Sequence, residues 1–188
     1  ERVLPGAILL RVASSHIRVG TFEFFASQSR YDLVRSLADY SIKRHFPELQ
    51  GRKDRYLSLL STVLTRQADL LAKWMSIGFI HGVMNTDNMT ISGETIDYGP
   101  CAFLDEYDPG KVFSSIDHQG RYKYSNQPKV AAWNLSRFAE TLLPLISDKQ
   151  EDAIKEAQSL IEDFDGIYIS AYKEHMCRKI GISNTSLV

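Results

Sequence analysis

Two short polar segments of this chain carry residues that suit a divalent metal ion. Asn88 ends the segment His81–Asn88, and Asp97 opens the tripeptide Asp97-Tyr98-Gly99. Mg²⁺ is a hard cation that takes oxygen ligands from one or two protein groups and from nucleotide phosphates. Two short apolar runs flank the turn Ser92-Gly93-Glu94 between the segments, which predicts a small β-hairpin. We expect this hairpin to bring the oxygens of Asn88 and Asp97 together.

The order of the two segments matches the larger lobe of protein kinases. In kinases, a catalytic loop with the pattern H-R-D-x-x-x-x-N is followed by a D-F-G tripeptide, and both supply metal ligands. His81 and Asn88 lie seven positions apart, as in that loop. Where kinases have the catalytic aspartate, two positions after the histidine, this chain has Val83, which cannot accept a proton. The nearest carboxylate is that of Asp87.

Several segments of the chain resemble the selenoprotein O family. The family signature is similar to the block His81-Gly82-Val83-Met84-Asn85-Thr86-Asp87-Asn88 and to Asp97-Tyr98-Gly99-Pro100. The resemblance includes residues 11–22 upstream and residues 127–135 downstream, and it extends from residue 3 to about residue 143. Members of this family are kinase-like proteins that bind ATP in a flipped orientation. They transfer AMP, rather than phosphate, to hydroxyl groups of proteins.

The resemblance implies a role for each candidate site residue. Asp87 is the implied proton acceptor, and Asn88 and Asp97 are the implied ligands of Mg²⁺ or Mn²⁺. Arg11 and Arg18 are the implied contacts of the nucleotide phosphates, for which a guanidinium has suitable geometry and charge. Asp97 also binds the nucleotide in this scheme, through the metal. The implied cofactor is ATP, and the implied partners are proteins with Ser, Thr or Tyr hydroxyls.

Part of the family's nucleotide site has no counterpart in this sequence. The glycine-rich loop, the ATP-binding lysine and its partner glutamate belong to the small lobe, and residues 1–188 contain none of them. The redox cysteine or selenocysteine region near the C-terminus of full-length relatives is absent too. Since the chain also begins with Glu1, we expect residues 1–188 to be a single domain, the kinase-like C-lobe of a longer protein. This fragment is expected to be inactive alone.

The elements that must position these residues are mainly helical. Apolar residues recur at three-four spacing from Tyr56 to Trp74, which predicts a long amphipathic helix that stops at Gly78 and forms the buried spine. Three further helices are predicted: from a Ser29 cap to Phe46-Pro47, from Val130 to Leu143 before Pro144, and from Lys149 to Lys173.

The strand signals are short. A strand-like run begins at Val3, and the β-prone segments Ala7–Val12 and Ile17–Phe25 predict two strands. Residues 100–128 are irregular and rich in Asp, Gly, Tyr and Ser, and within them Asp117–Tyr122 occupies the place of a kinase activation segment. The expected fold class is therefore α+β, mainly α, with a short β-hairpin that carries the metal ligands.

Composition excludes several classes of protein. With 44% hydrophobic and 24% charged residues, the chain is neither disordered nor collagen-like. A net charge of -1 provides no basic field for nucleic acid or an anionic membrane, and no apolar run approaches the ~18 residues of a membrane span. Cys101 and Cys177 have no CxxC partner, so we expect reduced thiols. The expected location is the bacterial cytoplasm, with a mitochondrial homologue as the alternative.

Three functions are compatible with the motifs. The first is a protein adenylyltransferase, the second a kinase-like phosphotransferase, and the third a non-catalytic pseudokinase that only binds. Val83 disfavours the phosphotransferase, because general-base help is typically worth about 10²–10⁴-fold and its usual bearer is absent. Asn88 and Asp97 disfavour the binding module, since a scaffold without chemistry needs no pair of metal ligands. The sequence favours the adenylyltransferase.

Overall fold

The computed structural model describes residues 6–182 of the chain. Residues 1–5 and 183–188 lie outside this description, and so does the start of the run that begins at Val3. Within the described range the α-helices are α1 (Val19–Ser27), α2 (Tyr31–His45), α3 (Arg55–Ser76), α4 (Gln127–Ile146), α5 (Gln150–Glu162) and α6 (Phe164–Lys179). The short 3₁₀ turns and strands are η1 (Pro47–Leu49), β1 (Phe79–Ile80), η2 (Thr86–Asn88), β2 (Ala102–Phe103) and η3 (Tyr124–Asn126).

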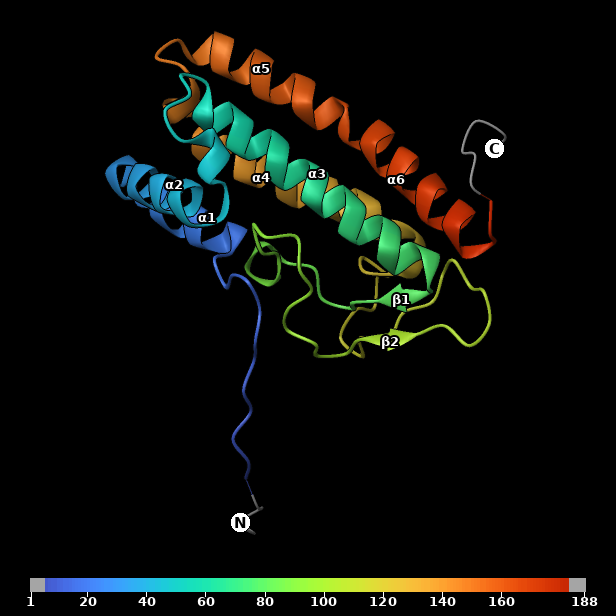
Figure 1. The fold of residues 1–188 in the computed structure, drawn as a ribbon. Coiled ribbons are helices and arrows are strands. Elements are labelled where there is room, and N and C mark those ends of the chain that lie inside the picture. Colours follow the sequence, from blue (N-terminus) through green and yellow to red (C-terminus); the bar gives the residue numbers. More distant parts are fainter. Residues whose placement is uncertain (1–5, 183–188) are drawn as a thin grey trace.

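The long amphipathic helix predicted between Tyr56 and Trp74 is α3, and it is buried as expected. Its apolar stripe includes Leu59, Leu60 and Leu71, all without solvent exposure. The helix packs against α4 on one side and against α5 and α6 on another, as Figure 1 shows. It ends at Ser76, close to the predicted stop. Burial of apolar area, which is worth roughly 25 cal/mol per Å², therefore makes α3 the spine of the bundle.

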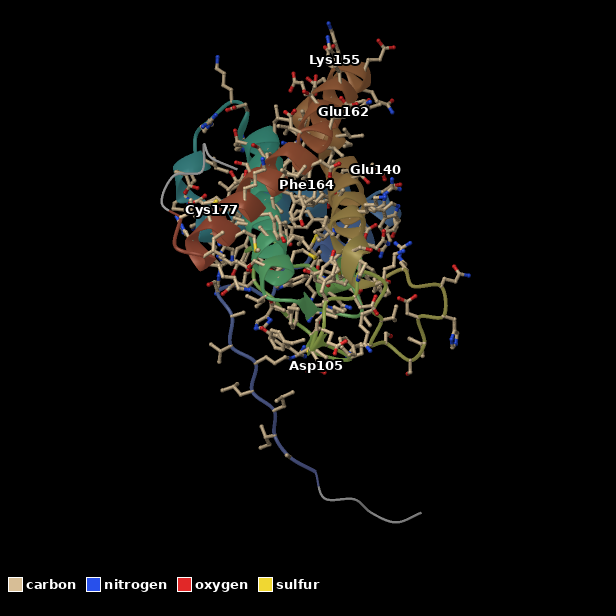
Figure 2. The ribbon with its side chains drawn as sticks, turned by 90° about the vertical axis from the view of Figure 1, so that its right-hand side faces the viewer. Asp105, Glu140, Lys155, Glu162, Phe164 and Cys177 are labelled. Carbon is tan, nitrogen blue, oxygen red and sulfur yellow. The ribbon has the colours of Figure 1, made fainter. Side chains whose placement is uncertain are left out.

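The predicted bounds of the two C-terminal helices need correction. Helix α4 continues past Pro144 to Ile146, because a proline in the last turn removes only one backbone hydrogen bond and the following residues remain helical. The single helix predicted from Lys149 to Lys173 is instead two, α5 and α6, which meet at Asp163. Figure 2 shows Phe164 at this junction, and its ring is fully buried. The break allows both helices to pack on the rest of the bundle.

The strand predictions near the N-terminus are wrong. Residues 17–25 lie mostly in α1, where Phe22 packs its ring edge-on against Phe138 of α4, with centroids 4.9 Å apart. Burial of Val19 and Phe22, three positions apart, follows helical and not strand periodicity. Residues 7–12 form no strand; their large apolar side chains are 82–100% exposed, and the segment extends away from the bundle in Figure 1.

The start of α2 also differs from the prediction. The residue that precedes its first turn is Arg30, whereas Ser29 has a left-handed backbone, with φ of 56°, and provides no cap. The end of this helix is as predicted, since Phe46 follows its last residue and Pro47 opens η1.

The sheet is smaller than the sequence predicts and lies elsewhere. The predicted hairpin is reduced to one antiparallel bridge, between Met89 and Thr95. The only two-stranded sheet in the described residues pairs β1 with β2, with Phe79 opposite Phe103. The chain is thus mainly helical with a small antiparallel sheet, so the α+β, mainly α, class is confirmed. No helix in the described range is both long and apolar enough to cross a membrane.

Candidate nucleotide and metal site

Residues 14–19 lie antiparallel to residues 89–94, and this pairing brings the N-terminal segment to the polar loop. The Val19 N–H donates to the Met89 carbonyl over 2.9 Å, and the Ser14 N–H donates to the Glu94 carboxylate over 2.9 Å. Burial alone would raise the pKa of Glu94, but hydrogen bonds from nearby serines outweigh it and lower the pKa. Glu94 therefore stays ionised and ties together two segments that are distant in the sequence.

Two arginines from the N-terminal segment converge on Asp97. Arg11 pairs with Oδ1 of Asp97, and Nη1 of Arg18 lies 3.0 Å from Oδ2. The same Nη1 donates to the backbone carbonyl of Asp87 over 2.8 Å. The structure therefore brings Arg11, Arg18 and Asp97 together, and Arg18 links them to the turn that carries Asp87.

The backbone and one oxygen of Asp97 are unusual. Its φ is 57°, in the left-handed region that aspartate tolerates better than most residues, and the Gly99 N–H donates to its carbonyl over 2.8 Å. Oδ2 is buried, and no donor of good hydrogen-bond geometry reaches it within the described residues, although Arg18 lies close. This oxygen faces the positive charge of Arg18, so a metal ion would take that place only when Arg18 pairs with another anion.

Asp87 and Asn88 lie on η2, which packs closely against the start of α1. A Cβ added to Gly20 would lie 3.0 Å from the Cα of Asp87, so any larger residue would require the backbone of η2 to shift by a few tenths of an ångström. The Asp87 side chain is exposed. The Asn88 amide nitrogen donates to the Val83 carbonyl over 2.8 Å, and this bond leaves the amide oxygen, the atom that ligates hard cations, for another partner.

Asn88 and Asp97 border different hollows. Asp97 lines a hollow of about 720 Å³ together with Arg11 and His16. Asn88 lines a separate one of about 10 Å³ beside Asn85. No group of three or more His, Cys, Asp and Glu side chains forms a metal cage in residues 6–182. A metal at Asp97 would therefore need ligands other than these side chains.

Three buried carboxamides from the helices hold the backbone of the polar loop. Gln67 of α3 donates to the Thr90 carbonyl over 2.6 Å, and Asn134 of α4 donates to the Met84 carbonyl over 2.9 Å. Gln127, the first residue of α4, makes two such bonds: it donates to the Phe79 carbonyl over 2.9 Å and accepts from the His81 N–H over 3.0 Å. The helical bundle thus positions both ends of the segment that carries Asp87 and Asn88.

His81 braces the loop rather than reaching the solvent. Its Nε2 lies 2.7 Å from the Ile96 carbonyl, and the Val83 N–H approaches its Nδ1 at 3.4 Å. Since a carbonyl can only accept and an N–H can only donate, the ring is the neutral tautomer with the proton on Nε2. Burial lowers its pKa, which favours the same neutral form. His81 therefore connects the loop to the residue that precedes Asp97.

Comparison with known proteins supports the resemblance. The family model described as "Protein adenylyltransferase SelO" matches residues 2–188. The chain belongs to this family. Among its curated relatives are proteins named "Protein nucleotidyltransferase YdiU": one from Shouchella clausii, 59% identical over 184 residues, and one from Chromobacterium violaceum, 60% identical over 183 residues. The match covers 98% and 97% of this chain, respectively, and 38% of each relative, so the chain spans well under half of their length.

The SelO match corrects the extent of the resemblance, and the structure adds residues that the motifs do not include. It reaches residue 188, so α5 and α6, which carry no motif, belong to the family region as well. Glu94 and Gln67 support the site through the contacts above, but each stands in the sequence as an ordinary polar residue. The burial of Gln67 and the hydrogen-bond partners of both residues identify them.

Gln127 provides a test of how the SelO loop is held. Gln127→Leu leaves the Phe79 carbonyl and the His81 N–H buried without partners, and each such group costs about 1–3 kcal/mol. We expect the free energy of unfolding to fall by roughly 2–5 kcal/mol in urea denaturation of the protein. The matched control is Gln158→Leu on the exposed face of α5, with a change below about 0.5 kcal/mol. Equal effects of the two substitutions would contradict the assigned role of Gln127.

Proposed function

We propose that this chain is the ATP and metal-binding part of a protein adenylyltransferase, with the architecture of a kinase larger lobe. The reaction moves AMP from ATP to a Ser, Thr or Tyr hydroxyl of a protein and releases pyrophosphate. The observation that carries the proposal is the convergence of Arg11 and Arg18 on Asp97 at the border of a hollow of about 720 Å³. This volume is in the range of small-molecule sites, about 300–1,000 Å³.

Each residue has a proposed task. Asp97 and Asn88 would hold Mg²⁺ or Mn²⁺ through Oδ2 and the amide oxygen, and the metal, when bound, neutralises charge on the attacked phosphate. Arg11 and Arg18 would exchange the Asp97 carboxylate for ATP phosphates, because guanidinium groups bind both. Their ion pairs with Asp97 keep them at the site before ATP arrives.

Asp87 is the proposed proton acceptor. Its side chain is exposed, while its backbone is held by Arg18, so the carboxylate is free to accept the proton of an incoming protein hydroxyl. Val83, at the place of the kinase aspartate, cannot take this role. With ATP in the flipped orientation that the family resemblance implies, the α-phosphate lies next to this carboxylate.

The location and partners follow from the same proposal. The relatives named above come from bacteria, and the proposed reaction needs both ATP and protein substrates. We therefore propose that the protein acts in the bacterial cytoplasm, where both are present. The net charge of -1 favours proteins over nucleic acids as acceptors.

The test is which phosphate of ATP is transferred. The full-length protein is incubated with Mg²⁺ and with ATP labelled at either the α- or the γ-phosphate, and incorporation into proteins is measured. We expect label from the α-phosphate only. Transfer of the γ-label would instead identify a kinase-like phosphotransferase, and ATP binding without either transfer would identify a binding module.

A further inference from the structure

An exposed tryptophan on α4, Trp133, lies between two arginines. Its side chain is 46% exposed. The guanidinium carbon of Arg121 lies 4.8 Å from the ring centroid, and that of Arg137 lies 5.4 Å away. Both distances are within the ~6 Å typical of cation–π contacts. The ring therefore holds two positive charges at the surface, and we refer to Arg121, Trp133 and Arg137 as the arginine–tryptophan surface.

The charges of this surface are incompletely neutralised. Arg137 pairs with Glu140 over 2.5 Å, a residue that Figure 2 labels on the same helix, but its Nε is buried without an acceptor among the described residues. The guanidinium of Arg121 contacts aromatic rings, and no carboxylate pairs with it in residues 6–182. Asp117 is close in sequence, but its carboxylate accepts the backbone N–H groups of residues 121 and 122. The guanidinium of Arg121 is thus left without a carboxylate partner among the described residues, and an acidic group of another molecule can pair with it.

The surface lies next to the loop that carries Asp87. Tyr122, which follows Arg121, donates its hydroxyl to the Asn85 side chain over 2.5 Å. Asn134, which follows Trp133, donates to the Met84 carbonyl over 2.9 Å. Both contacts reach the chain two to three residues before Asp87.

We infer that the arginine–tryptophan surface docks an acidic side chain of the protein that receives AMP. This inference rests on the proposed function, because it concerns the acceptor of that reaction. A Glu or Asp a few residues from the target hydroxyl matches the guanidinium of Arg121 in charge and geometry. The exposed ring of Trp133 contacts the aliphatic part of the same peptide, and Arg137 adds a second positive charge. The preferred substrates are therefore proteins with acidic residues near the modified Ser, Thr or Tyr.

Three peptides test this inference in the full-length protein. Each has one threonine in a Gly/Ala background and carries two Glu, two Gln or two Lys residues within six positions of it. Binding of fluorescently labelled peptides is measured without ATP, and transfer of α-labelled AMP is measured separately. We expect the Glu peptide to exceed the Gln peptide about tenfold in affinity and in kcat/KM, because two exposed charge pairs contribute up to about fivefold each. Added salt should reduce the difference.

The variant R121Q/R137Q should remove this preference while the KM for ATP stays within about twofold. The single variant R121Q changes only an exposed loop residue, so it keeps the test valid where loss of Arg137 disturbs α4. R121Q should lose part of the preference for the Glu peptide. The matched control is R178Q at an exposed arginine of α6, which should behave like the unmodified protein.

The results distinguish failure of the docking surface from failure of the proposed AMP transfer. Equal binding of the three peptides, or an R121Q variant that changes only the KM for ATP, overturns the docking surface. Selective binding of the Glu peptide with no transfer of α-label supports the surface and overturns the proposed function instead.

Discussion

Asp97→Asn in the full-length protein is expected to lower transfer of the α-label from ATP by at least about 10³-fold. A metal ion contributes several kcal/mol of charge stabilisation in such reactions, and each 1.36 kcal/mol is a factor of ten. Asparagine keeps the size of the side chain and tolerates the left-handed backbone at this position, whereas it lacks the charge that holds the metal. Asp97→Ala is expected to abolish labelling too, but it adds backbone strain at a φ of 57°.

The control separates loss of chemistry from loss of structure. Asp105→Asn changes an exposed aspartate in the irregular segment, labelled in Figure 2, and should leave both transfer and melting temperature unchanged. Asp97→Asn loses two ion pairs in which the Asp97 side chain is 19% exposed and those of Arg11 and Arg18 are 52% and 28% exposed. Its melting temperature is therefore measured beside its transfer rate, and a folded variant without transfer shows loss of chemistry. Full activity of Asp97→Asn would rule out Asp97 as the metal ligand.

Asp87→Ala is expected to lower kcat by about 10²–10⁴-fold, the usual contribution of a general base. The KM for ATP should change little, because Arg18 binds the backbone carbonyl of Asp87 and not its carboxylate. The substitution therefore leaves the link between η2 and the arginines intact. Initial rates of AMP transfer at varied ATP concentration measure both quantities.

The split between kcat and KM makes this result specific. Asp105→Ala again provides an exposed aspartate away from the site, and its rate should match that of the unmodified protein. If Asp87→Ala raised the KM for ATP and left kcat unchanged, Asp87 would be a binding residue. An unchanged kcat and KM would leave the reaction without its proposed base.

The sequence alone determined those structural elements that depend on contacts between residues close in the chain. The stripe from Tyr56 to Trp74 predicts α3 because a helix places residues three and four positions apart on one face. Pro47 marks the end of α2, since proline disfavours the continuation of a helix, and the mainly helical class follows from such signals. The segments around Asn88 and Asp97 also carry the family signature in their residue types and spacing alone.

Tertiary contacts decided what local pattern could not. Residues 17–25 are β-prone, yet most of them form α1, because burial of Val19 and Phe22 in the core outweighs a propensity worth at most about 1 kcal/mol per residue. β1 pairs with β2 across a long loop, while the short hairpin expected between Asn88 and Asp97 keeps one bridge. Strand pairing depends on partners that are remote in sequence, which periodicity cannot identify.

The site itself shows the same division. Its residue types are readable in the sequence, since arginine, aspartate and asparagine have recognisable chemistry. Their arrangement is not, because Arg11 meets Asp97 only after residues 14–19 dock against residues 89–94 through Glu94. The buried carboxamides of Gln67, Gln127 and Asn134 act through backbone groups more than twenty residues away. Such long-range hydrogen bonds exist only in the folded chain, and for that reason only the tertiary structure could assign them.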